Sequence, residues 1–364
     1  MMTGRLLAAA LALAPEPAAP PAQSPAVVAD VPAPPEQVLA IPASLRAALQ
    51  ERVISRSAPG EPRIRRLAEF LLGADGIHLL YVHDADLTVE QAWNTRTANC
   101  LTFTLLTVAL AREAGLDAYG QEIPKTLSWY SEGDTAYFSN HVNVGIRIGA
   151  HRYTLDVASD QVLSRDPPQK MDDRRLFAIY YSNRAADLMA AGRLADADAH
   201  LRASLRMDDR YATSWSNTGV IRLREGRGDE AEQAFLHALE LDRTHDAALV
   251  NLASLYGARG DAARQAEFNR RIERVRQRNP FHYFMLAVDD EKRGDYAGAA
   301  EHYRRAIKLY EGEHRFHFGL ARAYLHLGQA DKAGEALRRA QQVSDGATSN
   351  RYQAKLGKLR RLQD

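Results

Sequence analysis

A single cysteine, Cys100, is the most reactive side chain that the sequence offers. It follows Asn99 and precedes the apolar segment 101–113, whose periodicity predicts a helix that ends before Gly115. Cys100 is therefore expected in the first turn of a helix. The unpaired N–H groups and the dipole of a helix N-terminus stabilise a thiolate, which is the nucleophilic form of cysteine. This position suits a nucleophile in acyl transfer.

A base and a carboxylate follow further along the chain. The segments on either side of Gly149–Ala150 alternate apolar and polar residues, and this pattern predicts two antiparallel strands. With Gly149–Ala150 as a two-residue loop, Asn143 faces Asp156, and His141 is a diagonal neighbour on the same side of the hairpin. A longer loop or a bulge would change this register. In the two-residue register, Asp156 is placed to orient the imidazole of His141.

The order cysteine, histidine, aspartate, with the cysteine heading a helix and the other two on neighbouring strands, resembles the transglutaminase-like superfamily. The resemblance covers residues 63–158 and is carried by Asn99–Cys100, His141–Val142 and Leu155–Asp156. It implies a papain-like α+β domain over residues 36–175 that performs acyl transfer.

Carried over residue by residue, the resemblance implies three catalytic roles. Cys100 would attack a carbonyl carbon, His141 would take the thiol proton, and Asp156 would hold the productive imidazole tautomer. The backbone N–H of Cys100 would form part of the oxyanion hole, and the side-chain donor is left open between Trp93 and Asn99. The reaction would be amide hydrolysis, as in a peptidase or amidase, or exchange to an amine, as in a transglutaminase. Hydrolysis is favoured because it needs no second substrate site.

The C-terminal half repeats with a period of 34 residues. Five glycines mark the period, small residues recur seven positions before and five positions after them, and large residues fill further matching positions. The glycines are Gly192, Gly226, Gly260, Gly294 and Gly328. This pattern resembles the tetratricopeptide repeat (TPR), an all-α helical solenoid, with five repeats over residues 178–345. The third repeat deviates most, since Gln265 and Asn269 stand where alanine and an aromatic residue are expected. Residues 346–364 are expected to contain a capping helix.

A solenoid of this kind presents a concave surface to a protein or peptide. The family register places Asn183, Asn217 and Asn251 on that surface, where an amide could bind an extended backbone. Phe284 would add an apolar contact there, beside Phe281. Asparagine is also common at this repeat position for structural reasons. The Lys/Asn pattern that clamps a chaperone's C-terminal carboxylate is not visible, so a chaperone tail is not the expected partner.

Composition excludes several classes of protein. The net charge is +1 from 47 basic and 46 acidic residues, which gives no basic field for nucleic acid. One cysteine excludes intrachain disulfides and cysteine-based metal centres. The group His78, His83, Asp84 and Asp86 lacks the spacing of metal ligands. No metal or organic cofactor is therefore expected.

The N-terminus suggests export. Residues 1–14 resemble a secretory signal peptide, and residues 15–35 form a linker rich in proline and alanine. The mature chain, with no internal membrane span, is expected in the periplasm. The alternative is a cytoplasmic protein with a mis-assigned start. A second alternative concerns function: a TPR scaffold whose transglutaminase-like module binds without catalysing. The sequence leaves the oligomeric state open.

Overall fold

The computed structural model describes residues 29–129, 136–157, 162–163, 166–344 and 346–360. The proposed signal peptide, residues 1–14, lies outside the described residues, as does most of the linker that follows it. Val31–Asp364 forms one compact unit. No helix in the described part of the chain is long and apolar enough to cross a membrane.

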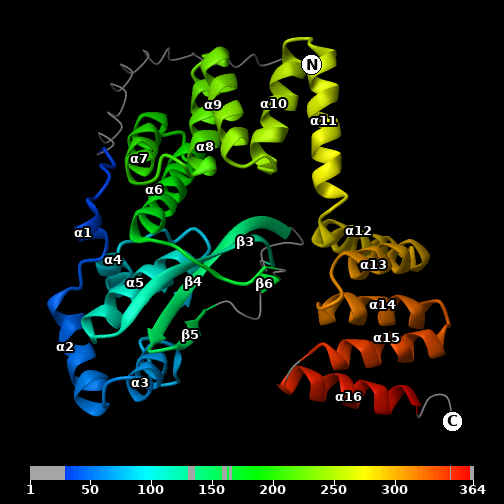
Figure 1. Cartoon of the computed structure of the whole chain (residues 1–364), viewed down its shortest axis with the longest axis horizontal. Helices are drawn as coiled ribbons and strands as arrows, with labels where there is room; N and C mark the ends of the chain where they lie inside the picture. Colours follow the sequence, from blue (N-terminus) through cyan, green and yellow to red (C-terminus); the bar gives the residue numbers. More distant parts are fainter. Residues whose placement is uncertain (1–28, 130–135, 158–161, 164–165, 345, 361–364) are drawn as a thin grey trace, which may run out of the picture. The chain divides into compact units, whose positions relative to one another are not determined.

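The N-terminal region is mixed α/β (Figure 1). Its helices are α1 Pro35–Val38, α2 Ala43–Arg52, α3 Glu61–Leu72, α4 Val89–Thr95 and α5 Cys100–Glu113, with a 3₁₀ turn at Ile54–Arg56. Its main sheet contains β3 Asp117–Trp129, β4 Ala136–Ile148, β5 His151–Leu155, β6 Val162–Leu163 and β7 Gln169–Lys170. A separate parallel pair joins β1 Leu80–Tyr81 to β2 Thr97–Ala98.

The main sheet is antiparallel, with the order β5-β4-β3-β6 and with β7 also paired to β3. Ile148 pairs with His151, so Gly149–Ala150 is the two-residue loop of the β4–β5 hairpin. Gly149 has φ +57°, a value that such a loop requires and that glycine adopts without steric cost. The register predicted from the sequence is confirmed, and it brings His141 and Asp156 to one end of this hairpin.

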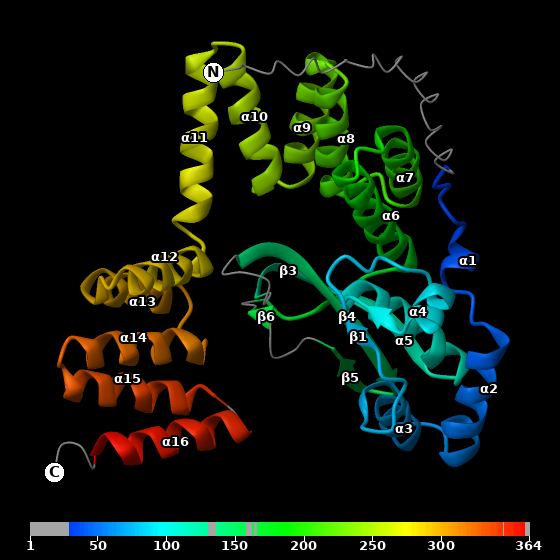
Figure 2. The same ribbon diagram turned by 180° about the vertical axis from the view of Figure 1, so that it is seen from behind.

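Helix α5 is the central element of this region. Its residues from Leu101 to Ala111 are all buried, in a core that includes Val144 and Ile146 of β4. Figures 1 and 2 show α5 beside β3 and β4 from both sides. The core continues into the next helix, α6, through Phe177 and Tyr181. One hydrophobic core therefore spans the border expected near residues 175–178.

The C-terminal region of the described chain is an all-α array of helix pairs and a last helix. The helices are α6 Asp173–Ala190, α7 Leu194–Met207, α8 Ala212–Arg224, α9 Gly228–Leu241, α10 Asp246–Ala258, α11 Ala262–Arg276, α12 Pro280–Arg293, α13 Tyr296–Leu309, α14 His314–His326, α15 Ala330–Gln342 and α16 Gly346–Arg360.

The 34-residue glycines have the same conformation in every repeat. Their φ angles lie between +69° and +79°, which places each in the left-handed region at the end of the first helix of its pair. Glycine tolerates this conformation because it has no Cβ. The period read from the sequence is thus the period of the helix–turn–helix units.

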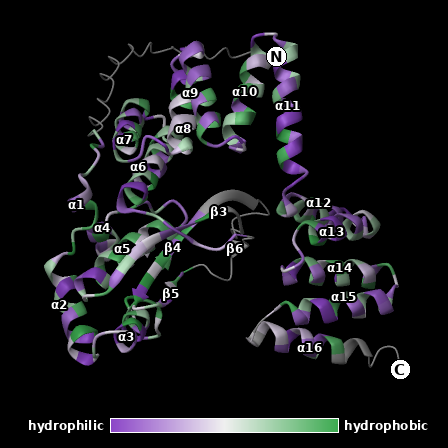
Figure 3. Ribbon diagram, in the orientation of Figure 1, coloured by the Kyte–Doolittle hydropathy of each residue, from purple (hydrophilic) through white to green (hydrophobic). Residues whose placement is uncertain are grey.

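The third repeat differs from the others in its packing. Phe268 is the one residue of α11 that is fully buried, and Figure 3 shows this helix as largely hydrophilic. Gln265 and Asn269 supply no apolar contact of the kind the other repeats use. The array contains separate cores, one over α6–α8, one over α8–α11 and one over α12–α16.

Candidate functional site

Cys100 is the first residue of α5, as predicted, and its side chain is partly buried. Asn99 caps the helix: its Oδ1 accepts a hydrogen bond from the backbone N–H of Thr102 at 2.8 Å. Thr102 is in turn held by the preceding loop, because its hydroxyl donates to the carbonyl of Ala85 at 2.5 Å. These contacts fix the turn from which the thiol projects.

His141 and Asp156 meet at the end of the β4–β5 hairpin. Nε2 of His141 lies 2.8 Å and 2.9 Å from the two carboxylate oxygens of Asp156. The imidazole is 2% exposed, and the carboxylate is 12% exposed. Cys100 lies close enough to His141 to raise the pKa of the imidazole. Since Nε2 is taken by Asp156, Nδ1 is the ring nitrogen left for the sulfur. The structure thus brings the three predicted residues together.

The charge state of His141 follows from these contacts. Burial alone would lower the pKa of the imidazole, because it removes water from the charged form. The hydrogen bonds to Asp156 and Cys100, together with attraction from both groups, outweigh burial and raise the pKa of His141 to about 9. His141 is therefore protonated at neutral pH when its two partners carry negative charge.

This shift predicts a pH dependence of stability. The folded-state pKa of about 9 exceeds the ordinary value of 6.5, so the contribution of His141 is complete below pH 6.5 and is lost as the pH rises through 9. We expect about 3 kcal/mol of unfolding free energy to disappear across this window. Urea unfolding at pH 6, 8 and 10 measures it. The difference in unfolding free energy between the wild type and His141→Leu should shrink with rising pH. A difference that stays constant would show that the pKa of His141 is not raised in the folded protein.

Asn143 extends the hydrogen-bond chain by one residue. Its Nδ2 donates to Oδ2 of Asp156 at 3.1 Å, which fixes the amide so that Oδ1 points elsewhere. That oxygen is buried and has no hydrogen-bond partner within the described residues. Asn143 therefore supports the negative charge on Asp156, the group that orients His141. The sequence placed Asn143 opposite Asp156 but did not assign it this role.

Neither candidate for the side-chain donor of an oxyanion hole is available. Both hydrogens of the Asn99 amide are used, one by the carboxylate of Asp86 at 2.9 Å and one by the carbonyl of His83 at 3.2 Å. The indole N–H of Trp93 donates to Ser44 Oγ at 2.9 Å. The backbone N–H of Cys100 at the helix N-terminus stays the candidate donor.

Three of the four residues expected on the concave surface of the repeats have contacts within the chain. Asn183 lies 3.5 Å from the carboxylate of Asp86, and Asn217 donates to Ser182 Oγ at 3.2 Å. Asn251 is half-buried. Phe284 is 8% exposed and packs against Phe316 with 5.2 Å between ring centroids. The assignment of Phe284 to a partner-binding surface is therefore corrected: this ring fills the core of the fourth and fifth repeats.

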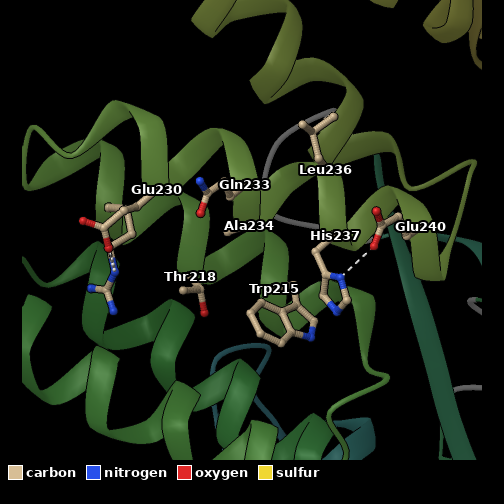
Figure 4. Close-up of a pocket in the computed structure, with 9 residues that line it drawn as sticks. Trp215, Thr218, Glu230, Gln233, Ala234, Leu236, His237 and Glu240 are labelled. Carbon is tan, nitrogen blue, oxygen red and sulfur yellow. Dashed lines mark hydrogen bonds and ion pairs between the residues drawn. The ribbon is translucent and has the colours of Figure 1, made fainter.

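A pocket of ≈ 520 Å³ lies on the second repeat, between α8 and α9 (Figure 4). Trp215 and His237 form one wall, with ring centroids 4.5 Å apart, and His237 pairs with Glu240. The pocket includes none of the three residues of the hairpin and α5 site. Its lining is an open mixture of charged and apolar groups, without a buried polar side chain aimed into it.

No group of three or more histidine, cysteine, aspartate or glutamate side chains is placed to hold a metal ion in the described ranges. His83, Asp84 and Asp86 lie on the loop before α4. Asp86 is used by Asn99, as described above. Sequence reasoning considered Asp86 only as a metal ligand and missed this contact, because it depends on the path of a loop without periodicity.

Comparison with known proteins identifies the C-terminal half. The tetratricopeptide repeat family matches residues 183–246 and 284–348. The C-terminal half of the chain thus contains tetratricopeptide repeats, and the gap between the two matches coincides with the atypical third repeat. The match does not reach the N-terminal mixed α/β region. No curated protein matches the chain.

Solved structures also align with parts of this chain, at 14% to 18% identity. YrrB, described as a TPR protein with an unusual peptide-binding site, is 18% identical and has a TM-score of 0.26; the alignment covers 49% of this chain and 92% of YrrB. MamA is 18% identical with a TM-score of 0.26, covering 46% and 91%. PilF of Pseudomonas aeruginosa is 14% identical with a TM-score of 0.28, covering 52% and 94%.

Proposed function

We propose that the protein is a thiol-dependent acyl-transfer enzyme that acts on amide bonds and whose TPR repeats recruit a protein substrate or partner. The observation that carries the proposal is the chain of contacts from Cys100 through His141 to Asp156. A buried histidine with a strongly raised pKa, held by a carboxylate and hydrogen-bonded to a cysteine at a helix N-terminus, is an arrangement suited to a thiolate–imidazolium pair.

The proposed reaction has two halves. Cys100 first transfers its thiol proton to His141. The thiolate sulfur then attacks the amide carbon and forms a tetrahedral anion, which the backbone N–H of Cys100 stabilises. The carbon–nitrogen bond breaks, His141 protonates the leaving amine, and a thioester remains. Water or a second amine then attacks the thioester while His141 removes its proton. The carbon–sulfur bond breaks, and an acid or a new amide leaves.

Asp156 keeps His141 in the orientation that this cycle needs. Its carboxylate accepts the Nε2 proton at both oxygens, so Nδ1 is the nitrogen that exchanges a proton with sulfur. The ordinary partners of a TPR array are proteins and peptides, and we assign that role to the repeats here. The choice between hydrolysis and amide exchange depends on which nucleophile reaches the thioester.

The single thiol permits a direct test. The rate of alkylation by iodoacetamide is measured from pH 5 to pH 10 for the folded protein and for the same protein unfolded in urea. The folded protein should react faster than the unfolded one below pH 7, where an ordinary thiol is mostly protonated. Equal profiles, or reaction only after unfolding, would favour the alternative of a TPR scaffold with a silent N-terminal module.

A further inference from the structure

A buried carboxylate, Asp86, touches the residue that precedes Cys100. Asp86 is 6% exposed, and its Oδ1 accepts a hydrogen bond from Asn99 Nδ2 at 2.9 Å. The other end of the same amide caps α5 by accepting from Thr102. Asn99 is thus held at both ends, and its orientation determines where the first turn of α5 begins. A displacement of this amide would displace the backbone N–H of Cys100.

The same carboxylate faces the first TPR helix. Nδ2 of Asn183, on α6, lies 3.5 Å from Oδ1 of Asp86, a long and therefore weak contact. Burial raises the pKa of Asp86, while hydrogen bonds from Asn99 and Asn183 and attraction from Arg184 on α6 favour its charged form. Burial, with repulsion from Asp86, raises the pKa of Asp187 to about 6, so the charge of Asp86 is also felt one turn further along α6. Asp86 therefore lies between the helix that carries the cysteine and the first helix of the repeats.

A second contact ties these two helices at their other ends. Arg112, in the last turn of α5, donates two hydrogen bonds to the carboxylate of Asp173 at the start of α6, at 2.7 Å and 2.8 Å. This bidentate geometry is the stronger form of an arginine–carboxylate pair. The two helices also share one hydrophobic core. These contacts link α6 to both ends of α5, and Asp86 is the contact at the cysteine end.

We propose that Asp86 is a positioning residue through which the first TPR helix sets the geometry at Cys100. The proposal rests on the proposed function, since it concerns the reactivity of that thiol. It also gives Asn183 an internal role in place of a partner-binding one. Partner binding by the remaining repeats would then act on Cys100 through α6 without touching the site itself.

The test compares alkylation of Cys100 across pH in full-length variants. Asp86→Leu removes the acceptor for Asn99 and should slow alkylation at pH 6 by about tenfold, the lower end of what outer-shell hydrogen bonds contribute at other sites. Asp86→Asn retains an oxygen that can accept from Asn99 and should recover part of the rate. If Asp86→Leu does not fold, the alkylation rate of Asp86→Asn shows whether Asp86 influences the reactivity of Cys100.

Asn183→Leu on α6 is compared with Asn269→Leu on α11, where the asparagine side chain is exposed. Asn183→Leu should slow alkylation at pH 6 measurably. Asn269→Leu, on the exposed face of the third repeat, should leave the pH profile of alkylation unchanged. The proposal is overturned if neither Asp86→Asn nor Asn183→Leu changes the pH profile while His141→Ala does. If His141→Ala also leaves the pH profile of alkylation unchanged, both the proposed function and the role of Asp86 are overturned.

Discussion

Replacing His141 with alanine is expected to slow the alkylation of Cys100 at pH 6 by roughly 10²-fold. A cysteine without a charged partner is ionised to only about 0.3% at this pH, because an ordinary thiol titrates near 8.5. In the wild type, Asp156 and Cys100 outweigh burial and raise the pKa of the imidazole to about 9, so a positive charge lies beside the thiol at pH 6. The variant loses that partner, so only the small thiolate fraction reacts.

The β4–β5 hairpin also supplies the control for this measurement. His151 lies on the same hairpin, at the first position of β5, and its side chain is exposed. His151→Ala should react like the wild type at every pH. Circular dichroism of both variants checks that the sheet is retained. An equal rate for wild type and His141→Ala would show that the imidazole does not activate the thiol.

Truncation of Tyr181 is expected to have the largest effect on stability. Tyr181 belongs to the first repeat, yet its ring is 2% exposed within the core that contains α5, and its hydroxyl donates to the carbonyl of Ala33 at 2.5 Å. Tyr181→Ala should lower the free energy of unfolding by about 3–5 kcal/mol, the usual cost of removing a fully buried aromatic ring. Urea unfolding followed by circular dichroism measures it.

Two variants separate the causes of this loss. Tyr181→Phe keeps the ring and removes only the hydroxyl, and it should cost about 1 kcal/mol. Tyr283→Ala changes the same position of the fourth repeat, where the ring is half-buried, and should cost less than Tyr181→Ala. If Tyr181→Ala lowers the free energy of unfolding by less than Tyr283→Ala does, the first repeat does not share its core with the N-terminal region.

Local periodicity predicted the parts of the molecule that depend on local rules. The 34-residue glycines predicted the helix pairs because a left-handed residue must end the first helix of each unit. Gly149–Ala150 predicted the register of the β4–β5 hairpin because loop length fixes which residues face each other. That register, with Cys100 at a helix N-terminus, was enough to place the candidate site.

Contacts between distant segments could not be predicted in this way. Asp86 reaches Asn99 and α6 through an irregular loop, and no spacing in the sequence indicates that path. Phe284 follows the register of a surface position but lies in the core, because its neighbours Phe316 and Tyr303 pack around it. The shared core of α5 and α6 is likewise invisible to repeat analysis, which treats the first repeat as a separate unit.

Thioester formation on Cys100 can be followed by the intact mass of the protein after brief exposure to p-nitrophenyl acetate. The folded wild type should gain one acetyl group on Cys100 and release p-nitrophenolate, and added methylamine or water should then remove the acetyl group. His141→Ala should acquire it far more slowly. An unmodified Cys100 in the folded wild type, or equal acetylation in both proteins, would show that Cys100 is not a nucleophile activated by His141.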